Sequence, residues 1–449
     1  MSIKAHLARS GYRIRFVALL LSDKTVSDAP EIEERLWNIK RTTGLDPKYN
    51  LFFLPPRTTS EQLSAFCSNI ISIIYPMCLD YYRDLTKHAR RKKNKGSVPA
   101  PTVPPTSGTS QLLSLQAWGA RYEFKLGVLA EFRGEVEIAS RHYSAVLEAI
   151  TLKDEIFEIT PHWSPRWNEA RMLCDVCLIR LIRSLFRLRN TTAAVQVWAG
   201  YRNRLQDLVD RKGKGSANYG WKAWESRMFK VMSELIEGAE IPAFAIQQLS
   251  GNPETVATYR QVFCDREGSV AKTELLPPWH LLHHSGYWLA QAAASSDERK
   301  KLAEDIPDED RAPPDMSPAS QVAHRNRTYD SYLCLEPYQE RPLLGDGGFD
   351  HCGETVNLLE KAATSFAAYG QERMAAKMKF QIATQYMLSK RHLEAFAILQ
   401  KLWDKKMWKK EKWDSLAYEV TRLLSACALN AQDRKMALLT SWELSNKCM

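Results

Sequence analysis

The chain has 449 residues, of which 45% are hydrophobic and 25% are charged. These proportions are typical of a folded globular protein and exclude a chain that is disordered along its whole length. The 62 basic and 52 acidic residues give a net charge of +10, which suits nucleic acid, anionic lipid or an acidic protein surface and selects none of them. The 9 cysteines are scattered and lie mostly in apolar runs, which indicates a reducing compartment.

Residues 1–57 have the pattern of a partial α/β unit. Residues 12–21 and 51–54 are predicted as strands and residues 30–42 as a helix. Strand, helix and strand at this spacing form a βαβ unit with a right-handed crossover. Basic residues before Asp23 also suit a targeting sequence, but the alternation favours a strand. Because two strands do not make a stable parallel sheet, we expect the chain to be a piece of a longer protein.

Residues 58–95 are predicted to form one long helix that begins at the capping residue Thr59 and is kinked at Pro76. The basic residues at its end are Arg90, Arg91, Lys92, Lys93 and Lys95. They suit the phosphate groups of an anionic membrane, but also the negative end of the helix dipole. No aromatic residue is interleaved with them, so we expect no nucleic acid as a partner. No apolar run approaches the ~18 residues that cross a bilayer.

Beyond this helix, the composition divides the chain further. Residues 96–110 are a Pro/Ser/Thr linker. Apolar residues recur at helical spacing in residues 111–295 and 351–449, which are predicted as two helical blocks. Residues 296–350 are first acidic and proline-rich, then glycine-rich, and are predicted as an irregular connection. Within the first block, further helices are expected at residues 191–210, 218–238, 242–248, 253–263 and 279–295.

Two segments have the spacing of tetratricopeptide hairpins. The first match consists of Leu126, Gly127, Gly134, Ala139 and Tyr143, and the second of Ala383, Tyr386, Ala395 and Leu399. Lys390 takes the place of the turn glycine in the second hairpin. A hairpin of this type needs neighbours to bury its apolar face. The predicted fold is therefore mainly α-helical: a tetratricopeptide-like α-solenoid of antiparallel helix hairpins with a small N-terminal α/β piece.

A CxxC motif and a histidine run are the main candidates for chemistry. Cys174 and Cys177 fall on the apolar stripe of a helix, so core packing is preferred to a redox or zinc site. His280, His283 and His284 have spacings that would suit a metal on a helix, but no acidic residue lies within a turn of them. We therefore expect no metal and no cofactor.

Two further motifs have weaker functional interpretations. Residues 213–216 (GKGS) lack the first glycine of a phosphate-binding loop. Trp403, Trp408 and Trp413 lie among lysines and suit either a partner contact or core packing. No nucleophile–base pair or dinucleotide fingerprint occurs, so we expect no enzyme activity.

Several segments resemble the foie gras domain, which marks the eleventh subunit of the TRAPP vesicle-tethering complex. They are residues 122–143, 167–183, 207–224 and 373–395, preceded by a similar leading segment at 44–55. The resemblance covers roughly residues 35–449. It implies a scaffold subunit of a complex that acts in endoplasmic reticulum-to-Golgi transport and autophagy.

The resemblance also implies partners and a location. The partners would be other TRAPP subunits and, indirectly, Rab GTPases, whose exchange chemistry belongs to smaller subunits. The location would be cytoplasmic, at Golgi and ER–Golgi membranes. The alternative is a peripheral membrane-binding module that uses the basic run 90–95 on an anionic membrane surface.

Overall fold

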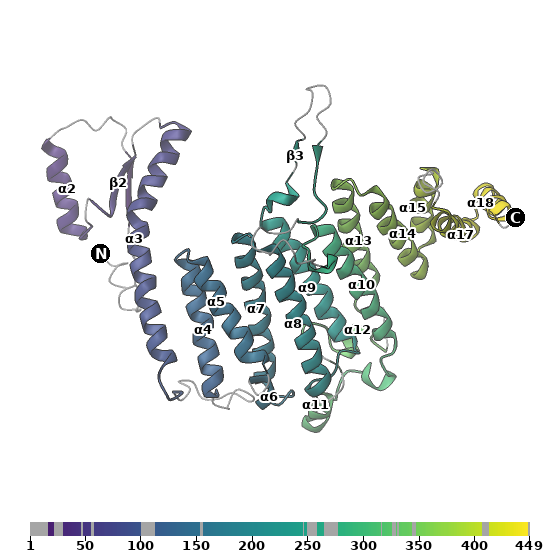
Figure 1. The fold of residues 1–449 in the computed structure, drawn as a ribbon, viewed down its shortest axis with the longest axis horizontal. Helices are drawn as coiled ribbons and strands as arrows, with labels where there is room; N and C mark the ends of the chain where they lie inside the picture. The colour runs from purple at the N-terminus through teal and green to yellow at the C-terminus, as the bar shows by residue number, and fades with distance from the viewer. Residues whose placement is uncertain are drawn as a thin grey trace. The chain divides into compact units, whose positions relative to one another are not determined.

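A computed structural model describes residues 17–21, 30–45, 48–54, 58–99, 113–152, 156–245, 247–248, 258–264, 277–315, 317–325, 329, 332–343, 347–405 and 413–447. Helices make up most of these residues (Figure 1). The chain divides into two compact units: Met1–Lys92 with Phe132–Gly134, and Lys93–Glu131 with Glu135–Met449. The prediction of a mainly helical chain with a small sheet is confirmed.

The first unit contains β1 (Ala18–Leu21), α2 (Pro30–Thr43), β2 (Leu51–Leu54) and most of α3 (Ser60–Lys93). The two strands are parallel, with Ala18 opposite Leu51 and Leu21 opposite Leu54. This pairing confirms the predicted βαβ order. The earlier part of the predicted first strand, residues 12–16, lies outside the described residues.

Helix α3 is continuous through Pro76, and its buried residues are Thr86 and Ala89, near its C-terminal end. It contains an 18-residue window with a mean hydropathy of 1.4, long and apolar enough by length and composition to cross a membrane. The expectation that no apolar stretch reaches this length was therefore wrong. Serines interrupt the apolar residues, but isoleucine, leucine and phenylalanine keep the average high.

The second unit begins with helices that follow one another closely. They are α4 (Leu115–Phe132), α5 (Val136–Thr151), α6 (Ile156–Ile159), α7 (Pro165–Arg187), α8 (Thr191–Lys212), α9 (Tyr219–Gly238) and α10 (Ser285–Glu304). A continuous apolar core runs through them and includes the fully buried Tyr143, Cys174 and Leu205. The apolar stripes predicted from the sequence supply most of this core.

The prediction of helices between α9 and α10 was wrong. The described residues here form a short 3₁₀ helix, η1 (Pro242–Phe244), and a strand, β3 (Gln247–Gln248), which pairs antiparallel with β4 (Thr258–Tyr259). Residues 251–257 lie outside the described part of the chain. Proline at the first position of η1 permits a helical turn, but the segment lacks the apolar repeat that extends a helix.

Helix α10 begins later than predicted because the preceding residues form η2 (Pro278–His280) and a bridge at His283. The ring of His284 caps α10: its Nδ1 accepts a hydrogen bond of 3.1 Å from the Gly286 amide. The helix then continues to Glu304, so the prediction of irregular structure from residue 296 was wrong over its first turns.

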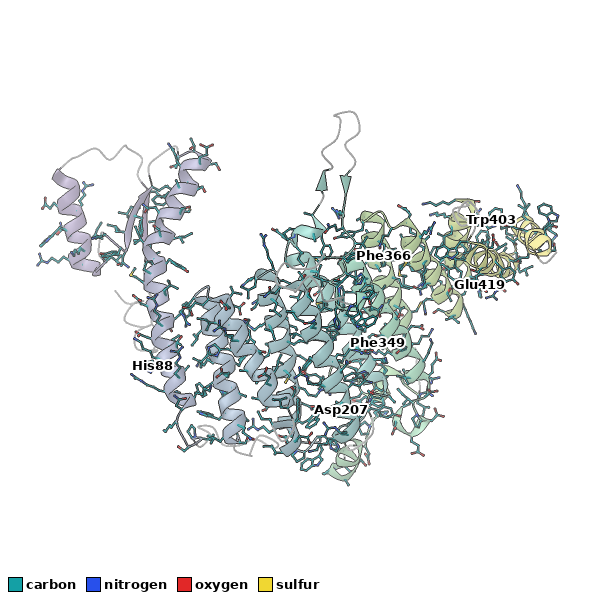
Figure 2. The ribbon with its side chains drawn as sticks, viewed as in Figure 1. His88, Asp207, Phe349, Phe366, Trp403 and Glu419 are labelled. Atoms are coloured by element: carbon teal, nitrogen blue, oxygen red, sulfur yellow. The ribbon has the colours of Figure 1, made fainter. Side chains whose placement is uncertain are left out.

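The remainder of residues 296–350 contains η3 (Asp308–Asp310), α11 (Pro318–Arg325) and α12 (Pro337–Glu340). A buried bidentate ion pair joins α12 to α10, with Arg299 donating to Glu340 over 2.7 and 2.6 Å. Phe349, labelled in Figure 2, lies with its ring 3.7 Å from the same guanidinium. The segment between α10 and α13 is thus held against α10 by this ion pair.

The last block contains α13 (His351–Ala368), α14 (Glu372–Leu388), α15 (His392–Asp404), α17 (Asp414–Asn430) and α18 (Arg434–Lys447). Packing follows the chain: α9 lies on α10, α10 on α13, α13 on α14, α14 on α15, α15 on α17 and α17 on α18. Trp403, also labelled in Figure 2, donates from its indole to Glu443 over 3.0 Å. Sequential helices therefore build this core pair by pair.

Five turns between consecutive helices share one geometry. A residue with φ between 59° and 76° follows the first helix at Gly134, Arg189, Gly370, Lys390 and Gln432. In each case the next amide donates to the carbonyl five residues earlier, over 2.8 to 3.0 Å. This is the hydrogen bond of a Schellman C-cap. The shared turn gives consecutive helices the same reversal of direction.

Candidate functional site

The hairpin of α4 and α5 is built on a close approach at Gly127. A Cβ atom added there would lie 2.7 Å from Cε1 of Tyr143, so only glycine leaves room for the ring. Tyr143 and Ala139 are fully buried, and Leu126 is nearly so. Gly134 turns the chain with a φ of 76°. The predicted small and large residues thus lie at the centre of the hairpin.

Glu131 joins this hairpin to α7. Its carboxylate accepts hydrogen bonds from Tyr143 over 2.8 Å and from Arg180 over 2.6 Å, and it also pairs with Arg183. Burial alone raises the pKa of Glu131, but the hydrogen bond from Tyr143 and the charge of Arg183 hold it below its usual value. Burial and the same carboxylate raise the pKa of the Tyr143 hydroxyl. These polar groups therefore serve the packing of three helices.

The second predicted hairpin, α14 and α15, has a similar centre. Ala383, Ala395 and Leu399 are fully buried. Tyr386 is half-buried, and the guanidinium of Arg391 lies 4.4 Å from its ring. Lys390 occupies the turn with a φ of 59°, a conformation in which glycine carries no steric cost.

The predicted basic run lies at the end of α3 and just after it. Arg90, Arg91, Lys92 and Lys95 are exposed. Lys93 is half-buried and forms an ion pair with Glu123, which also bonds His142 over 2.7 Å. The hydrogen bond from His142 and the partner Lys93 lower the pKa of Glu123 to about 2, against the opposing effect of burial. Lys93 is therefore engaged in the fold through Glu123.

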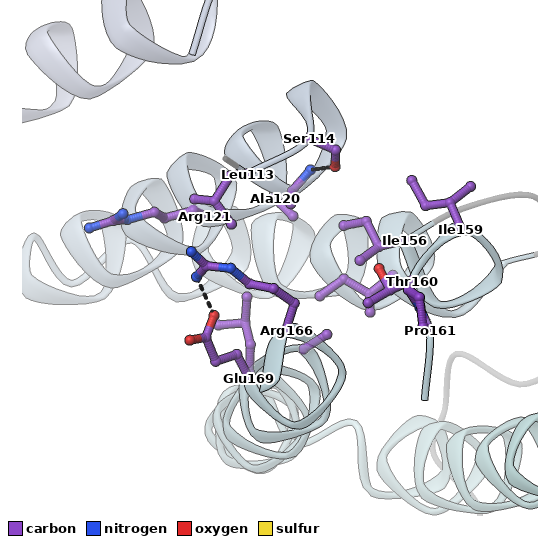
Figure 3. A pocket seen from close by; sticks show the side chains of 14 residues that line it. Leu113, Ser114, Ala120, Arg121, Ile156, Ile159, Thr160, Pro161, Arg166 and Glu169 are labelled. Carbon is purple, nitrogen blue, oxygen red and sulfur yellow. Dashed lines mark hydrogen bonds and ion pairs between the residues drawn. The ribbon is translucent and has the colours of Figure 1, made fainter. Parts of the chain in front are cut away.

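A cavity of about 380 Å³ lies where α4, α5, α6 and the start of α7 meet (Figure 3). The buried side chains of Ile150 and Ile156 and the half-exposed Ile159 contribute its apolar lining. The volume is within the range of pockets that accept small ligands or the anchor side chains of a partner. This cavity could not be predicted from the sequence, because its residues come from four separate elements.

Charged groups also line the cavity. Arg121 and Arg166 line it, and Arg166 pairs with Glu169 over 2.6 Å (Figure 3). Helix α7 begins at the same place, where the Ser164 hydroxyl accepts from the Arg166 amide over 3.3 Å. The positive end of that helix dipole adds to the arginine charge. An apolar group that carries a carboxylate would complement this lining.

The remaining motifs have structural roles. Cys174 and Cys177 are fully buried within α7, and burial raises the pKa of Cys177 to about 12, which disfavours the reactive thiolate. His283 stacks on Tyr287 and His284 on Tyr369, with ring centroids 4.5 and 4.2 Å apart. Among the residues that the structure describes, no three His, Cys, Asp or Glu side chains gather to hold a metal.

The glycine motif and the tryptophans complete the set of predicted candidates. Residues 213–216 form the loop between α8 and α9, where the Ser216 amide donates to Asp210 over 2.6 Å. Trp403 is bonded to α18, and Trp413 is partly exposed at the start of α17. Trp408 lies outside the described residues.

Comparison with known proteins identifies the family. Residues 166–447 match the model described as Foie gras liver health family 1, which covers more than half of the chain. Residues 1–63 match the model of the Trafficking protein particle complex subunit 11 N-terminal domain. No curated protein matches the chain. The chain therefore belongs to the foie gras family and is similar to the eleventh subunit of the trafficking protein particle complex.

Proposed function

We propose that the chain is a non-enzymatic scaffold subunit of a TRAPP-type tethering complex. It would act in endoplasmic reticulum-to-Golgi transport and autophagy, and would support Rab GTPase activation by holding other subunits together. The observation that carries the proposal is the pair of family matches, to a foie gras region over residues 166–447 and to a trafficking-complex domain over residues 1–63. The proposed location is cytoplasmic, at Golgi and ER–Golgi membranes.

The packing supports a scaffold mechanism. We infer a tetratricopeptide-like solenoid, because consecutive helices pack pairwise and five of the turns between them share one geometry. Stacked hairpins hold their surfaces in place before a partner arrives, so docking orders few side chains and costs little entropy. Buried polar groups are bonded within the core: Glu131 accepts from Arg180, and Asp175 on α7 accepts from the Tyr201 hydroxyl over 2.9 Å. They hold helices together and leave the surface for partners.

The cavity beside α4 is the proposed anchor point for one partner subunit. Ile159 stands at its wall and is 55% exposed. A partner side chain placed in the cavity would be desolvated on several sides, as in the hot spots of protein interfaces. A carboxylate next to that side chain would meet Arg121 and Arg166. Partner recognition would then be apolar at the centre and electrostatic at the rim.

Recovery from cells tests the proposal. The tagged full chain would be expressed and its co-purifying proteins identified by mass spectrometry. We expect TRAPP core subunits with the wild type, and loss of at least one of them with Ile159→Asp. Leu393→Asp is the matched control, since Leu393 is another exposed aliphatic residue, on α15, far along the chain. A folded wild-type chain that recovers no TRAPP subunit would contradict the proposal.

A further inference from the structure

Helix α3 carries an apolar ridge that the described residues of its own compact unit leave largely exposed. We define the α3 ridge as Leu63, Cys67, Ile71, Ile74 and Cys78, which recur every three or four residues and so lie on one side of the helix. Ile71 is 63% exposed and Leu63 44%, and both cysteines are also exposed. Apolar surface of this length on a soluble helix indicates a contact that the folded chain itself does not supply.

The helix is amphipathic, because another side of it is polar. Ser68, Asn69 and Ser72 face away from the α3 ridge and are exposed as well. A helix that spans a bilayer is apolar on every lipid-facing side, whereas a helix that lies in the interface has one apolar and one polar side. Although α3 is long enough to span, its residue pattern fits the interface.

Positive charge follows the ridge on the same helix. Arg83 and Lys87 are paired with Asp80 and Asp84 over 2.9 and 3.3 Å. Three further basic side chains lie on the following turn and are also exposed at the surface: Arg90, Arg91 and Lys92. At 1.5 Å of rise per residue, they lie only about 20 Å along the axis from the end of the ridge. Apolar and cationic surfaces are therefore presented by one continuous element.

We propose that α3 lies in the interfacial layer of an anionic lipid bilayer. The α3 ridge enters the boundary between headgroups and acyl chains, and Arg90, Arg91 and Lys92 contact the anionic headgroups. Tyr75 and Tyr81, which are 50% and 38% exposed, place amphipathic rings at the level where tyrosine is enriched in membrane proteins. Apolar insertion and cationic attraction add up on such a helix. The site goes beyond the scaffold role, because it would attach the subunit to a membrane directly.

Vesicle co-sedimentation of the full chain tests the proposal. The vesicles would consist of phosphatidylcholine with or without phosphatidylserine, at low and high salt. We expect binding to the anionic vesicles that weakens as salt rises. Each basic side chain contributes about fivefold in affinity near an anionic surface, so the Arg90→Gln/Arg91→Gln/Lys92→Gln variant should bind about 100-fold more weakly. A Leu63→Ser/Ile71→Ser variant should lose about tenfold or more.

Matched controls separate this site from general charge and apolar effects. Arg141→Gln/Arg391→Gln/Arg422→Gln removes the same charge from exposed positions on other helices and should keep most of the binding. Leu393→Ser removes an exposed leucine from α15 and should do the same. Equal binding to both kinds of vesicle, full binding by the α3 ridge variant, or an equal loss with the control triple would each overturn the proposal. Recovery of TRAPP subunits from cells is measured in a separate experiment. The scaffold proposal can therefore hold even if the chain does not bind vesicles.

Discussion

Substitution of Gly127 by alanine tests the packing of the α4–α5 hairpin. The new Cβ would lie 2.7 Å from Cε1 and 3.0 Å from Cδ1 of Tyr143, closer than carbon atoms approach without displacement. The ring has little freedom to move, since it is fully buried and its hydroxyl donates to Glu131 over 2.8 Å. The change therefore forces apart the two helices or breaks that hydrogen bond.

Two effects of opposite sign determine how much Gly127→Ala changes the free energy of unfolding. Alanine stabilises a helix interior relative to glycine by about 1 kcal/mol. Overpacking of a core costs about 1–3 kcal/mol, and a contact below 3 Å belongs in the upper part of that range. We expect a net destabilisation of about 1–2 kcal/mol. In a Tyr143→Leu background the ring is absent, so Gly127→Ala should become stabilising by up to about 1 kcal/mol.

Hydrogen exchange measured by mass spectrometry detects the local destabilisation of the α4–α5 hairpin. Peptides from α4 and α5 should exchange about 5- to 30-fold faster in Gly127→Ala than in the wild type. Tyr143→Phe keeps the ring, so the same substitution should remain destabilising in that background. Unchanged or slower exchange of Gly127→Ala in the wild-type background would refute the close approach. So would destabilisation of equal size in the Tyr143→Leu background.

Three further predictions concern other parts of the helical region. Lys390→Gly should raise the free energy of unfolding by about 1 kcal/mol, because φ is 59° at Lys390 and glycine removes that strain; urea unfolding would measure it, and no gain would argue against a strained turn. Arg299→Ala should cost about 3–5 kcal/mol by leaving Glu340 buried without its partner, whereas an Arg299→Met/Glu340→Leu pair should cost much less; thermal unfolding by circular dichroism compares them, and equal losses would contradict the reasoning. The pKa of Glu123 is lowered to about 2 by its hydrogen bond from His142, so its stabilising contribution should be complete above about pH 4.5 and lost as the pH falls toward 2; a Glu123→Gln variant should lack this part of the acid dependence, and identical acid profiles would exclude it.

The repeating helices could be predicted from the sequence because their signals are local. Small residues at Gly127 and Ala139 with a large one at Tyr143 mark a hairpin, and apolar spacing marks the stripes that become the core. Features made by distant residues could not be predicted in this way. The pair of Arg299 and Glu340 joins positions 41 residues apart, and neither residue alone indicates a partner.

Two other features carried misleading or incomplete signals. His284 suggested a metal ligand within a helix, but the structure uses its ring as the cap that starts α10. A histidine cap is not among the common capping residues, so the helix start was placed too early. The apolar character of α3 was overlooked because serines divide it into short runs, although the average over 18 residues is high.

Direct binding between purified components tests the scaffold proposal most closely. The chain would be mixed with purified TRAPP core subunits, and complexes would be detected by size-exclusion chromatography with light scattering. We predict a complex of defined stoichiometry that is weakened by Ile159→Asp and unaffected by Leu393→Asp. If the folded chain elutes alone at concentrations well above the dissociation constants of stable complexes, its role as a subunit that holds others together is contradicted.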